Sequence, residues 1–312
     1  MTPATVFFGT PEFAVPSLAA LLKAGIPVPL VVTQPDRPVG RHAEVRPSAV
    51  GAYAAERGLE VEKPERLRDN LALRDRLREA RPDAIAVVAY GKLLPADLLS
   101  LPRLGCVNVH ASLLPRHRGA SPVQAAILAG DRETGVVTMK MEEGLDTGPL
   151  YLERRTEIGE HETAGQLSEK LAREGGELLV ETLRRLDEGA LVARPQTGEP
   201  TVCRIIRRED GAVDWGLDAG EIARRLRAFT PWPGIYTFLG GERVKILGAH
   251  PDSGGSPQEP GTVAFEGGRL VVAAGNRTAL VLDRLQRAGR SPVTGAEFAR
   301  AASLPIRFRN AP

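Results

Sequence analysis

The sequence predicts an α/β protein of two domains, in which a doubly wound, mostly parallel sheet is followed by a small β-barrel of the oligonucleotide-binding type. Three observations support this. Strand-like and helix-like segments alternate over the first ninety residues, short β-rich runs separated by glycines follow after about residue 209, and 312 residues with 42% hydrophobic content suffice for two cores. We expect a first domain over residues 1–189, a linker over 190–208 and the barrel domain over 209–312.

The first domain should follow a strand–helix–strand order, which produces parallel strands with helices on both faces of the sheet. Strands are predicted at residues 4–9, 28–33, 83–90, 104–109 and 136–143, and helices at 11–24, 47–57, 70–80, 95–99, 122–129 and 163–188. The last of these helices has leucines along one face, and its Gly175-Gly176 pair is expected to be a weak point.

The second domain has a different pattern. A helix is predicted at 219–228 and a rigid PWPG turn at 231–234, followed by strands at 235–239, 243–247, 261–265, 269–273 and 279–286 and a last helix at 294–302. The linker before it, GALVARPQTGEPTVCRIIRR, combines proline, glycine and charge without a clear period.

Basic and acidic residues nearly balance over the chain, at 41 and 39, which argues against a protein that grips nucleic acid indiscriminately. They are distributed unevenly, because residues from 204 onward include 16 basic and 11 acidic side chains, against 25 and 28 before that point. A basic C-terminal third hints at a polyanionic partner, with chance in an arginine-rich chain as the alternative.

Motifs of several common enzyme classes are missing. The turn after the first strand, at residues 9–12, lacks the GxGxxG pattern of NAD and FAD enzymes. The sequence contains no GxSxG elbow, Cys106 and Cys203 form no CxxC pair, and the histidines show no metal-ligand spacing, so we expect neither covalent catalysis nor a metal. Without an apolar span or a leader-like start, a cytoplasmic protein that does not contact a membrane is expected.

Two polar residues stand at the end of the strand predicted at 104–109. Side chains alternate in an extended segment, so Asn108 and His110 point to one side and Val109 to the other. An asparagine amide can donate to a developing oxyanion, and an imidazole can exchange a proton near neutral pH. The pair is therefore a candidate catalytic centre, and the alternative is a structural asparagine turn beside a surface histidine.

A third candidate is Asp146, which lies in EEGLDTGPL after the strand predicted at 136–143. Its carboxylate can orient the imidazole and favour its protonated form, or it can close an Asx turn at residues 146–148, and both roles are compatible. An amide, an imidazole and a carboxylate without a nucleophile suit direct attack by a substrate amine on an activated carbonyl. That chemistry is acyl or formyl transfer.

These residues resemble the 10-formyltetrahydrofolate-dependent formyltransferases. The likeness rests on Asn108-x-His110, SLLPRHRG at 112–119 and LDTG at 145–148. Further segments are similar to the branch of that family that acts on methionyl initiator tRNA: FFGTPEFAVPSL at 7–18, TQPDRPVGR at 33–41, VVAYGKLLP at 87–95, DW at 214–215 and RAFTPWPG at 227–234. The likeness covers almost the whole chain and implies a Rossmann-like catalytic domain with an oligonucleotide-binding-type second domain.

The resemblance also implies roles for individual residues. Asn108, His110 and Asp146 would carry the formyl group from 10-formyltetrahydrofolate, a cosubstrate used without a metal, to the α-amine of initiator methionyl-tRNA. The folate site is expected along Ser112, Leu113, Leu114 and Pro115, and tRNA contacts at Arg37, Arg41 and Arg46, with solvated loop charges as the alternative. Where the family commonly continues Gly-Lys-Lys after Arg41, this chain has His42-Ala43-Glu44.

Other functions stay open at this point. The same transfer can act on an amino sugar nucleotide or on glycinamide ribonucleotide, although the second domain and the PWPG region argue against the purine enzyme. A nucleic-acid-binding protein with a catalytically silent body is a competitor of another class, against which the complete Asn-His-Asp set argues. A monomer is expected because no exposed apolar stripe demands a partner, and the basic loop at 116–118 has no predicted role.

Overall fold

The computed structural model of the chain describes residues 2–39, 44–302 and 306–310. The chain divides into two compact units. The first combines the residues up to Pro122 with Glu133–Glu157 and Ser168–Cys203, and the second combines Val123–Arg132, Ile158–Leu167 and the residues from Arg204 onward. The first unit thus extends to Cys203, through most of the stretch that was expected to be a linker.

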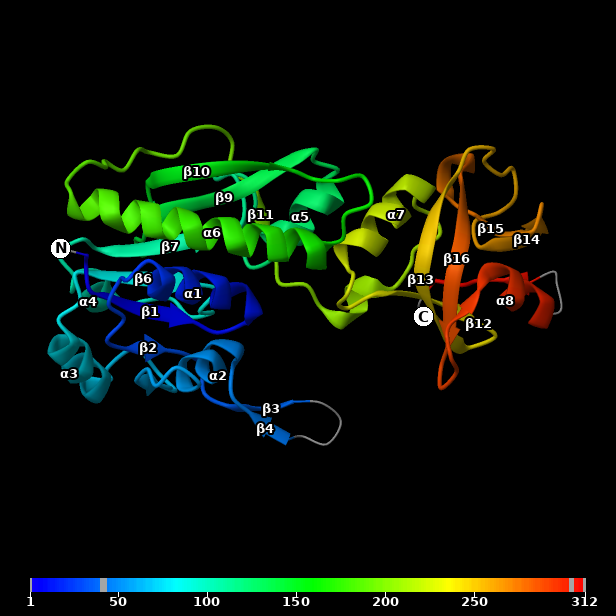
Figure 1. Cartoon of the computed structure of the whole chain (residues 1–312). Coiled ribbons are helices and arrows are strands. Elements are labelled where there is room, and N and C mark those ends of the chain that lie inside the picture. The colour runs from blue at the N-terminus through cyan, green and yellow to red at the C-terminus, as the bar shows by residue number, and fades with distance from the viewer. Residues whose placement is uncertain (1, 40–43, 303–305, 311–312) are drawn as a thin grey trace. The chain divides into compact units, whose positions relative to one another are not determined.

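A seven-stranded sheet forms the centre of the first unit, in the order β10-β9-β7-β6-β1-β2-β5 (Figure 1). Five strands pair in parallel: β1 (Thr5–Gly9), β2 (Val31–Val32), β5 (Val61–Glu62), β6 (Ala84–Val88) and β7 (Cys106–His110). The other two, β9 (Glu133–Lys140) and β10 (Leu150–Glu157), run antiparallel to their neighbours. The predicted mostly parallel sheet is confirmed. Two of its strands were not predicted, because β5 has only two residues and the charged edge strand β10 has only two buried residues.

The helices follow the predicted order, with ends that differ by a few residues. They are α1 (Val15–Lys23), which follows a 3-10 turn at Glu12–Ala14, α2 (Ala49–Ala55), α3 (Leu71–Ala80), α4 (Ala96–Leu99), α5 (Pro122–Ala129) and α6 (Ala164–Asp187). The Ser48 and Asn70 side chains begin α2 and α3 by accepting hydrogen bonds from the amides of Gly51 and Leu73. On one face of the sheet, residues of β1, β6 and β7 share an apolar core with α3 and α4.

The two adjacent glycines of α6, which were expected to be a weak point, allow the helix to pack closely against its neighbours. The helix continues through both residues. A Cβ atom at Gly175 would lie 2.8 Å from Cγ1 of Val109 and 3.2 Å from Cγ2 of Val136, and one at Gly176 would lie 2.8 Å from the Pro16 carbonyl oxygen. Because neither glycine has a side chain, α6 can lie directly against β7, β9 and the start of α1, beside which it runs in Figure 1.

Gly175→Ala is expected to lower the thermal midpoint by about 3 °C or more. Alanine improves helix propensity by about 1 kcal/mol, but overpacking against a stiff β-branched side chain costs about 1–3 kcal/mol. Calorimetry would measure the difference. In a Val109→Ala background, where the nearest clash is absent, most of the loss should disappear. A midpoint that is unchanged or raised by Gly175→Ala would contradict this account of the contact.

Two pairs of very short strands were not predicted. The hairpin of β3 (Arg37–Val39) and β4 (Glu44–Arg46) extends away from the main sheet (Figure 1). The second pair, β8 (Arg118–Gly119) and β11 (Val202–Cys203), is parallel and joins residues more than eighty positions apart. Strands of two or three residues are too short for any periodicity to reveal them.

The second unit is a nearly closed antiparallel barrel. Its strand order is β12 (Ile235–Leu239), β13 (Glu242–Asp252), β16 (Ala279–Arg287), β15 (Arg269–Ala273), β14 (Thr262–Glu266) and β18 (Ile306–Arg307), with β17 (Val293–Thr294) beside β16 and the helices α7 (Ala219–Ala228) and α8 (Gly295–Ala301). A bridge between Phe238 and Arg309 links the first strand to the terminal segment. In the core, the Trp215 indole donates to the Thr237 hydroxyl at 2.9 Å and stacks on Phe308. The five predicted strands are confirmed.

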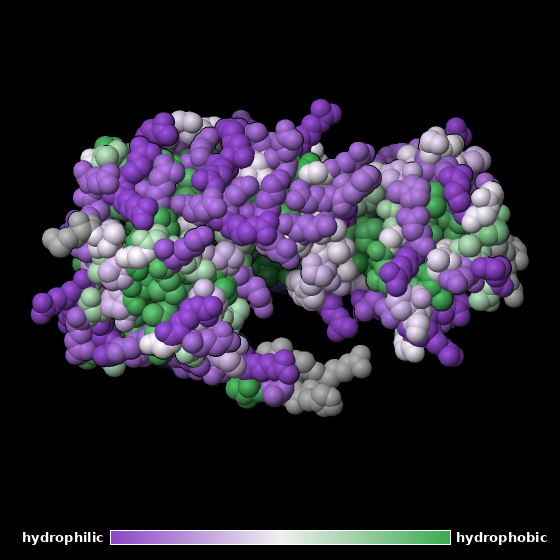
Figure 2. All heavy atoms as spheres, in the orientation of Figure 1, coloured by the Kyte–Doolittle hydropathy of each residue, from purple (hydrophilic) through white to green (hydrophobic). Residues whose placement is uncertain are grey.

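Hydrophilic side chains cover the outward face of α6, as Figure 2 shows where this helix crosses the first unit. The same helix buries leucines toward the sheet, in the pattern that predicted it. Within the described ranges, no helix is both long and apolar enough to cross a membrane.

Candidate active site

The interior strand β7 carries Asn108 and His110. Asn108 pairs in register with Val87 of β6 and Met139 of β9, so it stands where the sheet changes from parallel to antiparallel pairing. Val109 faces α6, and the two polar side chains therefore project from the opposite face, about 7 Å apart along the strand. Their exposed fractions are 9% and 6%, which excludes the alternative of a surface histidine beside an asparagine turn.

The His110 imidazole contacts two groups through its two ring nitrogens. Nε2 donates to the carbonyl oxygen of His117 at 3.0 Å. A carbonyl can only accept, so in the neutral imidazole Nε2 carries the hydrogen and Nδ1 is unprotonated. Nδ1 lies 3.7 Å from Oδ2 of Asp146, which is too long for a hydrogen bond but close enough for a strong charge effect. The Asp146 carboxylate therefore acts on the imidazole through its charge.

The position of Asp146 is set by a distant loop. Its Oδ2 accepts a hydrogen bond from the amide of Gly119 at 2.8 Å, across 27 positions of sequence. The carboxylate is thus held against the loop after β7 and is not committed to an Asx turn of its own. The backbone of Asp146 is left-handed, with φ of 52°, a conformation that costs a non-glycine residue about 1–2 kcal/mol.

Burial lowers the pKa of His110 below its ordinary value of 6.5. The Asp146 carboxylate and the hydrogen bond to His117 raise this pKa, and the His117 side chain lowers it, but the loss of hydration outweighs them. The imidazole is therefore neutral at pH 7, and its free Nδ1 faces a carboxylate oxygen. This pair of acceptors is suited to taking up one proton.

The side-chain amide of Asn108 has no hydrogen-bond partner among the residues that the structure describes. Its polar atoms are not among the fully buried ones that lack a partner, so a bound molecule can reach them. The amide is therefore available to a bound molecule, as an oxyanion donor must be.

The segment Ser112 to Pro115 follows β7 and packs against β9. The Ser112 hydroxyl is fully buried and donates to the Arg116 carbonyl at 2.7 Å, so it closes a turn of its own loop. Leu114 packs on Val137 and Met139. Leu113 is partly exposed, which leaves it, with the backbone around it, as the part of the segment that a ligand can reach.

Two of the arginines expected to contact tRNA, Arg37 and Arg46, lie on the β3–β4 hairpin. Arg37 and Arg46 are register partners across it, on exposed strands. Arg46 forms a 2.6 Å ion pair with Glu44, so the acidic residue that replaces a basic one in this loop neutralises a neighbouring arginine. Arg41 and His42 lie outside the described residues.

Several residues of the site were not predicted from the sequence. They act through backbone atoms or across long separations: His117 through its carbonyl, Gly119 through its amide, and Gln196, Thr201 and Cys203 from the expected linker.

Burial raises the pKa of Cys203, and that of Cys106 to about 12, so neither thiol is prepared to act as a nucleophile. In the described parts of the chain, no cluster of His, Cys, Asp and Glu could hold a metal ion.

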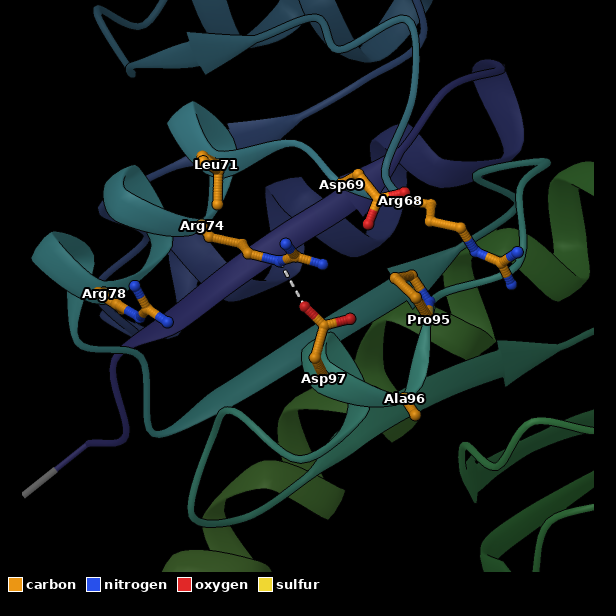
Figure 3. A pocket seen from close by; sticks show the side chains of 8 residues that line it. All are labelled: Arg68, Asp69, Leu71, Arg74, Arg78, Pro95, Ala96 and Asp97. Carbon is orange, nitrogen blue, oxygen red and sulfur yellow. Dashed lines mark ion pairs between the residues drawn. The ribbon is translucent and has the colours of Figure 1, made fainter.

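A hollow of about 590 Å³ lies elsewhere on the first unit, near α3 and α4 (Figure 3). Three arginines and two aspartates line part of it, and Arg74 is paired with Asp97 at 2.5 Å. None of the candidate site residues lines this hollow, so the catalytic assignment does not depend on it.

Known proteins resemble the chain over nearly its whole length. A formyl transferase family model matches residues 3–183, and a model of the formyl transferase C-terminal domain matches residues 205–303. The methionyl-tRNA formyltransferase of Anaeromyxobacter dehalogenans strain 2CP-1 is 48% identical over 297 residues, which are 94% of this chain and 95% of the relative.

Two solved structures share the fold. The N-formyltransferase of Helicobacter canadensis, in complex with folinic acid and dTDP-3-aminofucose, is 17% identical, with a TM-score of 0.64 over 92% of this chain and 100% of that one. HypX from Aquifex aeolicus, in complex with tetrahydrofolic acid, is 16% identical, with a TM-score of 0.61 over 96% of this chain. The chain spans 47% of HypX, about half its length. At these identities the likeness concerns the fold alone.

Proposed function

The chain belongs to the methionyl-tRNA formyltransferase family, and we propose that it moves the formyl group of 10-formyltetrahydrofolate to the α-amine of initiator methionyl-tRNA through Asn108, His110 and Asp146. A bond forms between the methionine nitrogen and the formyl carbon, and the bond from that carbon to N10 of the folate breaks. The amine loses one proton and N10 gains one, so the reaction needs a proton carrier and a donor for the oxyanion.

The observation that carries the proposal is the unpaired amide of Asn108 beside a neutral imidazole. Attack on the formyl carbon places negative charge on its oxygen, and the Asn108 amide donates to it from a position that the folded chain has already set. A preorganised donor of this kind contributes about 3–4 kcal/mol to the transition state.

The proton passes through His110. Its unprotonated Nδ1 accepts the proton of the attacking amine, and the imidazolium that forms is stabilised by the Asp146 carboxylate 3.7 Å away. The same nitrogen then returns the proton to N10 of the leaving folate. Because the His117 carbonyl continues to hold Nε2–H, the ring keeps its orientation throughout.

The folate is proposed to lie along Ser112, Leu113, Leu114 and Pro115. The buried Ser112 hydroxyl and the Leu114 side chain hold this segment in place. The partly exposed Leu113 and the backbone of the segment offer contacts to the folate. Action as a monomer belongs to the same proposal, because Asn108, His110 and Asp146 all come from one unit of one chain. A cytoplasmic location is proposed with it, because the proposed substrate is initiator tRNA.

A comparison of acceptors tests the proposed function. With 10-formyltetrahydrofolate as donor, formylation should be observed with initiator methionyl-tRNA and be far weaker with free methionine or an amino sugar nucleotide. Transfer to the sugar alone would overturn the assignment of the acceptor. No transfer to any of the three would overturn the proposed activity.

We further propose that Arg37, Arg41 and Arg46 contact phosphates of the tRNA. Arg37→Ala should raise KM for tRNA and reduce the slope of log affinity against log salt by about 1, because a phosphate contact releases a counterion. Glu44→Gln, which frees Arg46 from its ion pair, should lower KM for tRNA a few-fold at low salt. Initial rates would measure KM, and filter binding over a salt series would measure the affinity and its salt slope. An unchanged salt slope in Arg37→Ala would remove this residue from the interface.

A further inference from the structure

The segment 194–203, which we call the strap, crosses the two loops that carry the catalytic contacts. Arg194 forms backbone bonds of 2.7 and 2.8 Å with Leu150, next to the Asp146 turn. At the other end, the Thr201 hydroxyl accepts from the amide of His117 at 2.8 Å, and Cys203 pairs with Gly119 as β11 with β8. The strap therefore touches both sides of the proton-carrying pair.

Gln196 is the residue of the strap that joins the two loops. Its Nε2 donates to the carbonyl oxygens of Asp146 and Gly148, both at 2.8 Å. Its Oε1 accepts from Nε and Nη2 of Arg118, at 3.2 and 2.6 Å. One side-chain amide thus uses both hydrogens and both lone pairs.

These contacts close a ring around the catalytic carboxylate. Asp146 is held by its carboxylate through the Gly119 amide and by its carbonyl through Gln196, and Gln196 is in turn bound to Arg118, the residue before Gly119. A left-handed aspartate persists only where its surroundings fix it, and here both ends of the residue are fixed.

We propose that Gln196 is a positioning residue for formyl transfer, which holds the Asp146 turn against the loop of residues 117–119 and so sets the distance between Asp146 and His110. This inference rests on the proposed function. Packing cannot take over this task, because Val192 and Val202, near the two ends of the strap, are 80% and 77% exposed, and no residue from 194 to 203 is buried. The hydrogen bonds of the strap therefore determine where it lies.

Two substitutions of similar size test the proposal. Gln196→Glu keeps the acceptors for Arg118 but turns both donors into an oxygen that repels the carbonyls of Asp146 and Gly148. Gln196→Met removes all four bonds without adding charge. Each should lower kcat on the order of 10-fold, while KM for the folate and for tRNA changes less than about twofold, because misplacement of a catalytic group acts on the chemical step.

The pH profile separates positioning from a general structural role. The titratable groups that act on His110 are Asp146 and His117, and Asp146 raises its pKa. If the Asp146 turn moves away, the acid limb of the kcat profile should shift to lower pH. A variant that merely loses stability would lose active enzyme at every pH, with the limb in place.

A matched control lies on the same strap. Glu199 is exposed, and Glu199→Gln is the opposite substitution to Gln196→Glu. It should leave kcat and the pH profile unchanged. Normal kcat in both Gln196 variants, a loss in Gln196→Glu alone, or a rise in KM alone would overturn the positioning role. Since wild-type formylation is measured in parallel, its absence would count against the proposed function instead.

Discussion

Asn108→Ala is expected to lower kcat for formyl transfer by about 100-fold or more, the loss measured when one preorganised oxyanion donor is removed from other enzymes. The amide has no partner in the described part of the protein, so its removal breaks no hydrogen bond of the fold. The thermal midpoint should therefore stay close to that of the wild type, and KM for both substrates should change little. Single-turnover kinetics with saturating substrates would measure the chemical step directly.

Asn108→Asp is the informative companion of that variant. The aspartate has nearly the same shape, but it offers a charged acceptor where the reaction needs a donor. Its turnover should be at least as low as that of the alanine variant, because like charges meet in the transition state. Near-normal turnover in Asn108→Ala would show that the oxyanion is stabilised by another group, and the site would have to be assigned again.

His110→Asn is expected to lower kcat by about 100-fold to 10,000-fold, the usual contribution of a positioned acid-base group. Without the imidazole, no group carries the proton from the methionine amine to N10 of the folate. The wild-type profile of kcat/KM should fall as the pH drops through a value below 6.5, because burial lowers the pKa of His110 and only its neutral form accepts a proton. In His110→Asn this limb should vanish from the profile.

Asp146→Asn tests the direction of the charge effect. The carboxylate raises the pKa of His110, so its neutralisation should lower that pKa further and move the acid limb to lower pH, while kcat at neutral pH falls because the imidazolium loses its counter-charge. His161→Gln, an exposed histidine in a turn before α6, should leave the profile unchanged. A limb that moves to higher pH in Asp146→Asn would contradict the arrangement described here.

Local patterns were enough to predict the order of the main strands and helices and the shared face of Asn108 and His110. The alternation of β7 places these two side chains together, because the pleat of a strand acts between residues two positions apart. The helix α6 was predicted from its leucines. In these cases the structure depends on neighbours in sequence.

Long-range contacts could not be predicted in this way. Gln196 stands in a stretch whose prolines and glycines are typical of a linker, and its partners lie 48 to 78 positions away. From helix propensity alone, Gly175 is predicted to weaken the helix. The reason for the missing side chain becomes clear only from the close approach of Val109 in the folded chain. Such residues have a role only once the chain is folded.

Gly119, at the end of the contact between β8 and β11, is another residue whose role depends on the folded chain. Its φ of 117° is open to glycine, and a Cβ atom there would collide with the carbonyl oxygen of Cys203. Any side chain would push the two short strands apart. It would also move the Gly119 amide away from the Asp146 carboxylate to which it donates. In the proposed mechanism, the empty volume beside the Gly119 amide is therefore as necessary for catalysis as the imidazole of His110.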